Sequence, residues 1–200
     1  MDHYEEIAAR GVDGQEILRM GAKVWAEAAM LHGPFHGDMH AGNIWVLDDG
    51  RGCFLDFGIM GELTDDWQQL LKDLFYTCAF DLDFTRVATA YRKVGAIPPD
   101  MDDAVLAGFL NGVLGPMLTD GFASIDIAQL VGQSLQMLKA YKTQVPQELV
   151  LIAKQLLYID RYTKFLAPDY SITADPFIVK NVFPAEAAKK AAEIGMVFPD

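Results

Sequence analysis

The chain has 200 residues, of which 52% are hydrophobic, so it can bury one core and is at the upper end of single-domain length. Its formal net charge of -12 at pH 7 would repel a phosphate backbone, which excludes nucleic acid as an expected partner. The longest apolar run, residues 104–118, contains glycine and proline and is too short to span a bilayer, and we expect no secretory leader.

The first predicted helix begins at Asp13, because Asp13 and Glu16 have the spacing of an N-cap and its N3 partner. Gly33 and Pro34 are expected to end this helix. Apolar residues at helical spacing predict its buried face, which would comprise Ile17, Met20, Val24, Ala28 and Leu31.

The segment that follows is predicted to form a β-hairpin. Residues 44–47 and 53–55 are short aromatic and β-branched runs, and residues 48–52 between them are typical of a turn. If Leu47 pairs with Cys53, then Ile44 lies opposite Asp56. Asn43 and Asp56 would then emerge side by side at the open end of the hairpin.

Helices are expected through the remainder, residues 64–200. Thr64 can cap a helix that continues to about residue 80, and proline and glycine separate further helices over residues 83–94, 102–118, 127–143, 147–166 and 185–194. Cys53 and Cys78 lack metal or redox spacing and are expected to be reduced core thiols of a cytoplasmic protein. The predicted fold is mainly α with a small β-hairpin, in a single domain over residues 1–200.

The residues around the hairpin favour magnesium–phosphate chemistry. An amide oxygen of Asn43 and the carboxylate of Asp56 are hard ligands, which suit Mg²⁺ that keeps other positions for water and phosphate oxygens. Asp38, five residues before Asn43, would hold a hydroxyl or water against a metal-bound phosphate.

The same residues carry a family resemblance. His36-Gly37-Asp38, followed by Asn43, resembles the catalytic loop H-x-D-x-x-x-x-N of the protein-kinase fold, and residues 56–58 resemble its D-F-G. HGDMHAGN with LDFGIMG, and the later residues 146–172, most resemble the UbiB or AarF family of atypical kinases, which is associated with isoprenoid quinone biosynthesis. The resemblance covers most of the chain.

The resemblance implies a role for each motif residue. Asp38 would be the catalytic aspartate of the loop over residues 36–43, and His40, Asn43 and Asp56 would bind Mg²⁺ and ATP. Asn43 and Asp56 would be the metal ligands, whereas His36 would be structural. Ala41 stands where the family usually has proline, which removes no chemical group.

Residues 1–35 contain no Gly-rich phosphate loop and no strand Lys with a partner Glu. The chain is therefore expected to be a protein-kinase-like C-lobe whose N-lobe is absent, and to need that N-lobe, in cis or in trans, for activity. The expected function is that of an ATP-dependent atypical kinase or ATPase supporting quinone or lipid metabolism. Peripheral contact with the inner face of a membrane would bring it to a hydrophobic isoprenoid or lipid substrate.

Two alternatives stay open. A small-molecule phosphotransferase of the aminoglycoside-kinase type shares the pattern H-G-D-x-H-x-x-N, but residues 57–61, Phe-Gly-Ile-Met-Gly, are unlike its second motif. A non-catalytic helical remnant, binding lipid or protein, would explain the missing lobe. It would not explain why Asp38, Asn43 and Asp56 are all intact.

Overall fold

The computed structural model describes residues 3–97, 100–119, 146–170 and 175–194, together with positions 129, 132, 133, 136, 139 and 140. The described chain is mainly helical and carries two small antiparallel sheets. The helices are α1 (Tyr4–Ala9), α2 (Gly14–Glu27), α3 (Asp65–Tyr76), α4 (Phe84–Lys93), α5 (Asp103–Thr119), α7 (Gln147–Leu166), α8 (Pro176–Val182) and α9 (Pro184–Ile194). The strands are β1 (Phe35–His36), β2 (Ile44–Val46), β3 (Gly52–Phe54) and β4 (Met60–Gly61).

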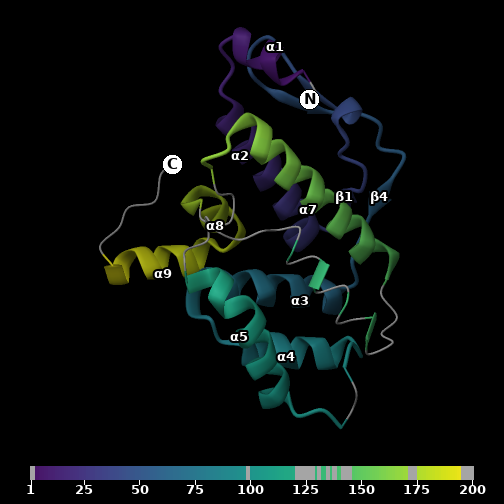
Figure 1. Cartoon of the computed structure of the whole chain (residues 1–200), viewed down its shortest axis with the longest axis vertical. Helices are drawn as coiled ribbons and strands as arrows, with labels where there is room; N and C mark the ends of the chain where they lie inside the picture. The colour runs from purple at the N-terminus through teal and green to yellow at the C-terminus, as the bar shows by residue number, and fades with distance from the viewer. Residues whose placement is uncertain are drawn as a thin grey trace.

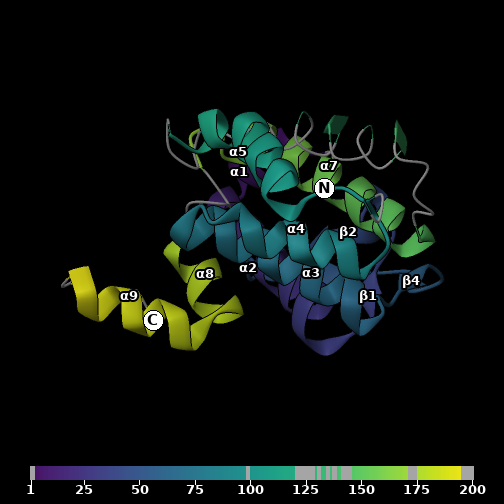
Figure 2. The same cartoon turned by 90° about the horizontal axis from the view of Figure 1, so that it is seen from below.

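The helices form two main layers (Figure 1). In one layer α4 packs against both α3 and α5, and in the other α2 packs against α7 (Figure 1). Helix α8 also contacts α2, and α9 continues from α8 to one side of the molecule (Figure 2). Buried side chains from α2, α7 and the segment between β1 and β2 share one hydrophobic cluster, so this segment is built into the core.

The predicted start and end of α2 are confirmed. The Asp13 carboxylate accepts hydrogen bonds from the backbone N–H groups of Gln15 and Glu16. A π-helical turn, Ala28–His32, continues the helix, and Gly33 ends it with a φ of 110°, which favours glycine.

The predicted buried face of α2 is partly wrong. Met20 and Val24 are 43% and 45% exposed, whereas Leu18, Ala22 and Trp25 are buried. The helix is apolar on more than one side, and α7 and α8 pack against the side that includes Leu18, Ala22 and Trp25. Periodicity alone did not distinguish the two faces.

The hairpin is confirmed but its predicted register is wrong by two residues. Ile44 pairs with Phe54, not with Asp56. The turn is tighter than expected, because the Leu47 N–H donates to the Arg51 carbonyl at 2.9 Å. Gly50 adopts a left-handed φ of 83°, as a short hairpin loop requires.

A second sheet, β1 with β4, was not predicted. Phe35 pairs with Gly61 and His36 with Met60. A Cβ on Gly61 would overlap the ring of Phe35, which is fully buried, so only glycine fits there. Strands of two residues are too short to show the alternation that identifies a strand.

Most of the later helices are confirmed. The bounds of α7 are those predicted, and α3, α4, α5 and α9 begin within one residue of the predicted positions, although α3 gives way to a π-helical turn at Thr77–Asp81. The short helices α1 and α8 were missed. The predicted helix over residues 127–143 lies largely outside the described residues.

The two cysteines are half-buried. Cys53 and Cys78 are both free. Burial raises the pKa of Cys78 to about 12, as expected for an inert core thiol. Among the described residues, none of the helices combines the length and apolar content needed to cross a bilayer.

Candidate functional site

The segment over residues 36–43, here called the 36–43 loop, is held by helix α7. The side-chain amide of Gln155, which is fully buried, accepts from the Met39 N–H at 2.7 Å and donates to the Gly37 carbonyl at 2.6 Å. The Tyr162 hydroxyl donates to the Met39 carbonyl at 2.8 Å. Three hydrogen bonds from one helix therefore fix the backbone on both sides of Asp38.

Gly37 is required by the closeness of this packing. Its N–H donates to the Ile59 carbonyl at 2.9 Å. A Cβ at this position would lie only 3.0 Å from an Ile59 methyl and 3.1 Å from a Leu151 methyl. The loop therefore passes between the segment leading into β4 and α7 without room for a side chain.

His36 joins the 36–43 loop to the segment that leads to Asp56. Its Nδ1 accepts from the Asp38 N–H at 3.1 Å, which places the ring proton on Nε2, 2.9 Å from the Leu55 carbonyl. Its ring also lies against Phe57, with the ring centroids 5.2 Å apart. These contacts agree with the structural role expected of His36.

The Asp38 carboxylate lies between two basic side chains. Its Oδ1 is 2.6 Å from Lys154 Nζ, and its Oδ2 is 3.8 Å from His40 Nε2. The hydrogen bond from Lys154 holds the pKa of Asp38 below its usual range, and the same bond raises the pKa of Lys154. Both shifts favour the ionised forms, so at neutral pH this is a carboxylate–ammonium pair.

His40 is oriented by its own turn. Its Nδ1 accepts from the Gly42 N–H at 3.0 Å, which leaves Nε2 as the nitrogen nearer to Asp38. A Cβ on Gly42 would lie 2.9 Å from the His40 ring, so the glycine lets the ring close onto the loop.

Asn43 ends a 3-10 turn, Ala41–Asn43, and is buried. Its Nδ2 donates to the Asp38 carbonyl at 3.0 Å. With the amide nitrogen used in this way, the amide oxygen Oδ1 is the atom that can serve as a metal ligand. The Asn43 carbonyl accepts from the Leu55 N–H at 2.8 Å, so Asn43 is one residue away from Asp56 across the hairpin.

Asp56 follows β3 in a tight turn. It is exposed and has a left-handed φ of 53°, which is uncommon outside glycine and best tolerated by Asp and Asn. Its Oδ1 accepts from the Gly58 N–H at 3.1 Å. This turn points the chain away from the hairpin directly after the residue that pairs with Asn43.

The structure therefore joins Asp38 to His40 and to Asn43 by direct contacts. Asp56 directly follows Leu55, the residue that lies opposite Asn43 in the hairpin. Within the described part of the chain, no three His, Cys, Asp or Glu side chains group as metal ligands. A pair of oxygen ligands, one amide and one carboxylate, still fits Mg²⁺, because this ion keeps several waters and takes phosphate oxygens as its remaining ligands.

Lys154 and Gln155 were missed by sequence reasoning. They lie 116 residues beyond Asp38 and Met39 in the chain, so motif spacing does not connect them. A signal was present, because the two are a polar pair in the otherwise apolar run of residues 149–153 and 156–157. A polar pair in such a run indicates a specific partner in the interior.

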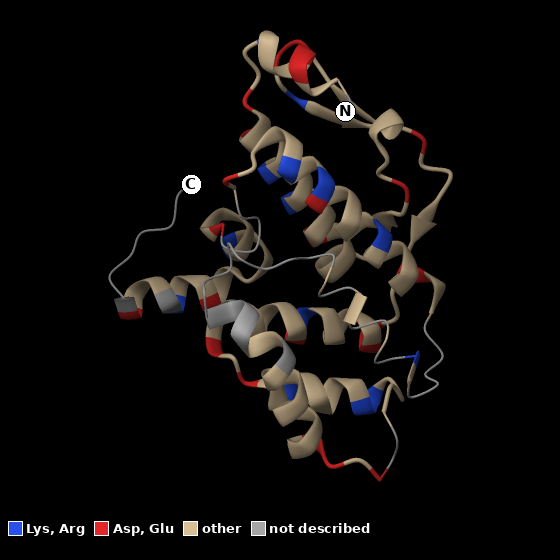
Figure 3. Ribbon diagram, in the orientation of Figure 1, with Lys and Arg blue, Asp and Glu red and all other residues tan. Residues whose placement is uncertain are grey.

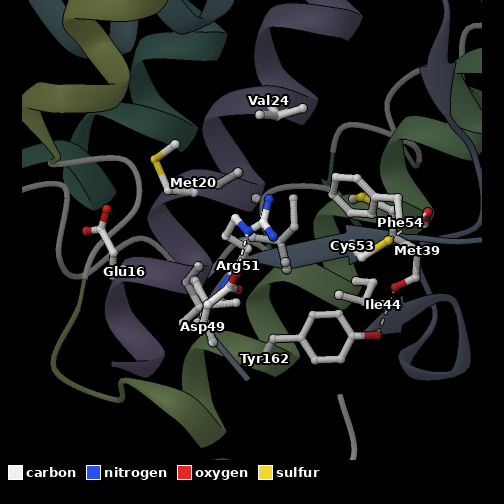
Figure 4. A pocket seen from close by; sticks show the side chains of 17 residues that line it. Glu16, Met20, Val24, Met39, Ile44, Asp49, Arg51, Cys53, Phe54 and Tyr162 are labelled. Carbon is white, nitrogen blue, oxygen red and sulfur yellow. Dashed lines mark hydrogen bonds and ion pairs between the residues drawn. The ribbon is translucent and has the colours of Figure 1, made fainter. Parts of the chain in front are cut away.

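A cavity of about 410 Å³ lies behind the 36–43 loop, between α2, the hairpin and α7 (Figure 4). Its walls are mostly apolar and include Met20 and Val24, two exposed apolar residues of α2, with Met39 and Tyr162 at the loop side (Figure 4). The paired side chains of Asp49 and Arg51 also line it. Its size is within the range of small-molecule pockets.

Two family models match the chain, each over a separate segment. The ABC1 atypical kinase-like domain matches residues 1–91, and the UbiB helical domain matches residues 110–171. Two uncharacterized proteins of Mycobacterium tuberculosis, one from each of two strains, are each 34% identical over 176 residues, which cover 88% of this chain. The match covers 36% of each relative, so the chain spans about a third of their length. No solved structure matches the chain.

Proposed function

Since the chain belongs to the UbiB family of ABC1 atypical kinase-like proteins, we propose that it is the C-lobe of an Mg²⁺–ATP-dependent kinase or ATPase. One observation carries the proposal: Asp38, Asn43 and the strand end that leads to Asp56 form one hydrogen-bonded unit. Within this unit the His36 ring bonds to the Leu55 carbonyl, and the Asn43 side-chain amide donates to the Asp38 carbonyl. Phosphoryl transfer depends mainly on such positioning and on electrostatic stabilisation.

Each residue has a distinct part in this proposal. The oxygens of Asn43 and Asp56 would hold Mg²⁺, which neutralises phosphate charge when it is bound. The exposed Asp56 carboxylate supplies negative charge, and the buried Asn43 supplies a fixed neutral ligand. Asp38, held as a carboxylate, would orient the hydroxyl or water that attacks. His40 would contact the phosphates from beside Asp38.

The turn over residues 56–58 favours this proposal over the aminoglycoside-kinase type. A Cβ on Gly58 would lie 3.0 Å from Asp56 Oδ1, the atom that accepts the Gly58 N–H. The glycine therefore belongs to the geometry that orients the carboxylate. The non-catalytic alternative has no comparable support, because the contacts that orient Asp38 and Asn43 are all present.

A nucleotide titration tests the metal-site part of the proposal. We expect residues 1–200 to bind Mg²⁺–ATP weakly, with a dissociation constant of about 1 mM, because water remains in an open site. Asp56→Asn should remove the Mg²⁺-dependent part of the binding, because it removes a ligand charge. Amide NMR spectra recorded during the titration would measure both.

The matched control is Asp65→Asn, which removes the same charge from an exposed position in the first turn of α3 and should leave binding unchanged. We also expect negligible ATP turnover by residues 1–200, and we propose that an N-lobe, in cis or in trans, supplies the phosphate-covering groups. Tight binding with hydrolysis that Asp56→Asn eliminates would contradict the C-lobe account. Equal loss in both variants would contradict the assignment of Asp56.

We also propose a hydrophobic isoprenoid or lipid substrate and peripheral contact with a membrane. The mostly apolar cavity behind the 36–43 loop supports this proposal. Vesicles that contain a hydrophobic quinone should sediment with more of the protein than quinone-free vesicles do. Val24→Asp places a charge on the cavity wall. This variant should sediment equally with quinone-containing and quinone-free vesicles. Equal sedimentation of the unmodified protein with both vesicles would exclude the membrane part of the proposal.

A further inference from the structure

Lys154 is the strongest cation contact of the candidate site. Its Nζ is 2.6 Å from Asp38 Oδ1, and its side chain is 42% exposed while that of Asp38 is 19% exposed. The contact joins two elements that are 116 residues apart. It is therefore a tertiary contact and not a pair within one helix.

The position of Lys154 is fixed by its neighbour. Gln155 follows it on α7 and bonds the backbone at Met39 and Gly37, the residues on each side of Asp38. Lys154 therefore stays within reach of Asp38 as long as α7 remains packed on the loop. Gln155 accounts for the anchoring of the loop, so Lys154 is not needed for that purpose.

The remaining donors of Lys154 are the basis of a function. An ammonium group has three N–H donors, and the bond to Asp38 Oδ1 uses one of them. The side chain is partly exposed, and blue segments mark the Lys and Arg residues along α7 (Figure 3). In a chain with a net charge of -12, Lys154 places an ammonium group beside this loop, where the Asp38 carboxylate balances its charge.

We propose that Lys154 binds the terminal phosphate of the nucleotide while it keeps its hydrogen bond to Asp38. This inference rests on the proposed function, because it places a nucleoside triphosphate next to Asp38. A γ-phosphate carries the charge that an ammonium binds as a point charge. A diphosphate, which lacks this group, does not reach Lys154.

The test compares the affinities of the chain for Mg²⁺–ATP and Mg²⁺–ADP by amide NMR titration. Lys154→Met should weaken ATP binding by about tenfold, the effect of losing one charge-assisted hydrogen bond, and should change ADP binding less than about twofold. Lys154→Arg should keep the preference for ATP. Lys164→Met is the matched control: it removes an exposed lysine from the same helix, which is paired with Asp160 on that helix, and should change neither affinity.

The outcomes separate this inference from the function on which it rests. If the unmodified chain binds neither nucleotide in the presence of Mg²⁺, the proposed function fails. If it binds ATP but Lys154→Met weakens ATP and ADP equally, or changes neither, Lys154 only positions Asp38 and the inference is overturned. Thermal unfolding monitored by circular dichroism checks the fold, and Lys154→Gln replaces the methionine variant if that variant does not fold.

Discussion

Gln155→Leu is expected to lower the free energy of unfolding by about 3 kcal/mol, because it leaves two buried backbone groups of the 36–43 loop without partners. The Met39 N–H and the Gly37 carbonyl each bond to the Gln155 amide, at 2.7 and 2.6 Å. Leucine has a similar volume and adds no cavity of consequence, so the loss comes from the unpaired groups. Urea denaturation monitored by circular dichroism would measure it.

The control for this experiment is Gln69→Leu. Gln69 is exposed on α3 and donates to Asp73 on the same helix at 2.9 Å, so its replacement should change the unfolding free energy by less than about 0.5 kcal/mol. A loss below about 1 kcal/mol for Gln155→Leu would mean that the loop groups find other partners. In that case α7 would not be what holds Asp38.

Asp175→Ala is expected to lower the free energy of unfolding by about 3 kcal/mol, because Asp175 is both a helix cap and a buried ion-pair partner. Its side chain is 1% exposed and lies 2.7 Å from Arg19 Nε. It also accepts from the Tyr170 hydroxyl and caps α8 through the Phe177 N–H. Its loss would separate α8 from α2 at this point.

Asp13→Ala provides the comparison. Asp13 caps α2 through the N–H groups of Gln15 and Glu16 but is exposed, so its loss should cost about 1 kcal/mol. The difference between the unfolding free energies that the two variants lose, measured by urea denaturation, gives the contribution of the Arg19 ion pair and the Tyr170 hydrogen bond. Arg19 is 28% exposed, so water partly compensates it, which keeps the expected cost at the low end for a broken buried pair. Equal losses in the two variants would show that Asp175 acts only as a cap.

The sequence predicted the features that depend on local chemistry. The cap at Asp13 and the bounds of α7 follow from residues within a few positions of one another, and both agree with the structure. The motif spacing predicted roles for Asp38 and Asn43; the structure connects the two residues through the Asn43 amide, and their roles stay predictions. Whether Asn43 and Asp56 hold one metal ion stays a prediction.

The features that depend on three-dimensional packing were missed or wrong. Met20 and Val24 on α2 formed a convincing apolar stripe, yet they line a cavity while Trp25 enters the core. The hairpin register was wrong because the loop is shorter than the composition of residues 48–52 indicated. Gly50 adopts the left-handed conformation that this shorter loop requires. The pairing of Lys154 with Asp38 required knowing which helix covers the loop.

The hydrogen bonds from α7 to the 36–43 loop also decide when the site can form during synthesis. The Met39 backbone leaves the ribosome 116 residues before the glutamine that holds it, Gln155. At an elongation rate of about 10 residues per second, the loop waits about 12 seconds for its helix. The loop lies in the segment that matches the ABC1 domain, and α7 lies in the segment that matches the UbiB helical domain. The first segment therefore cannot fix this loop in place until the second segment has been synthesised.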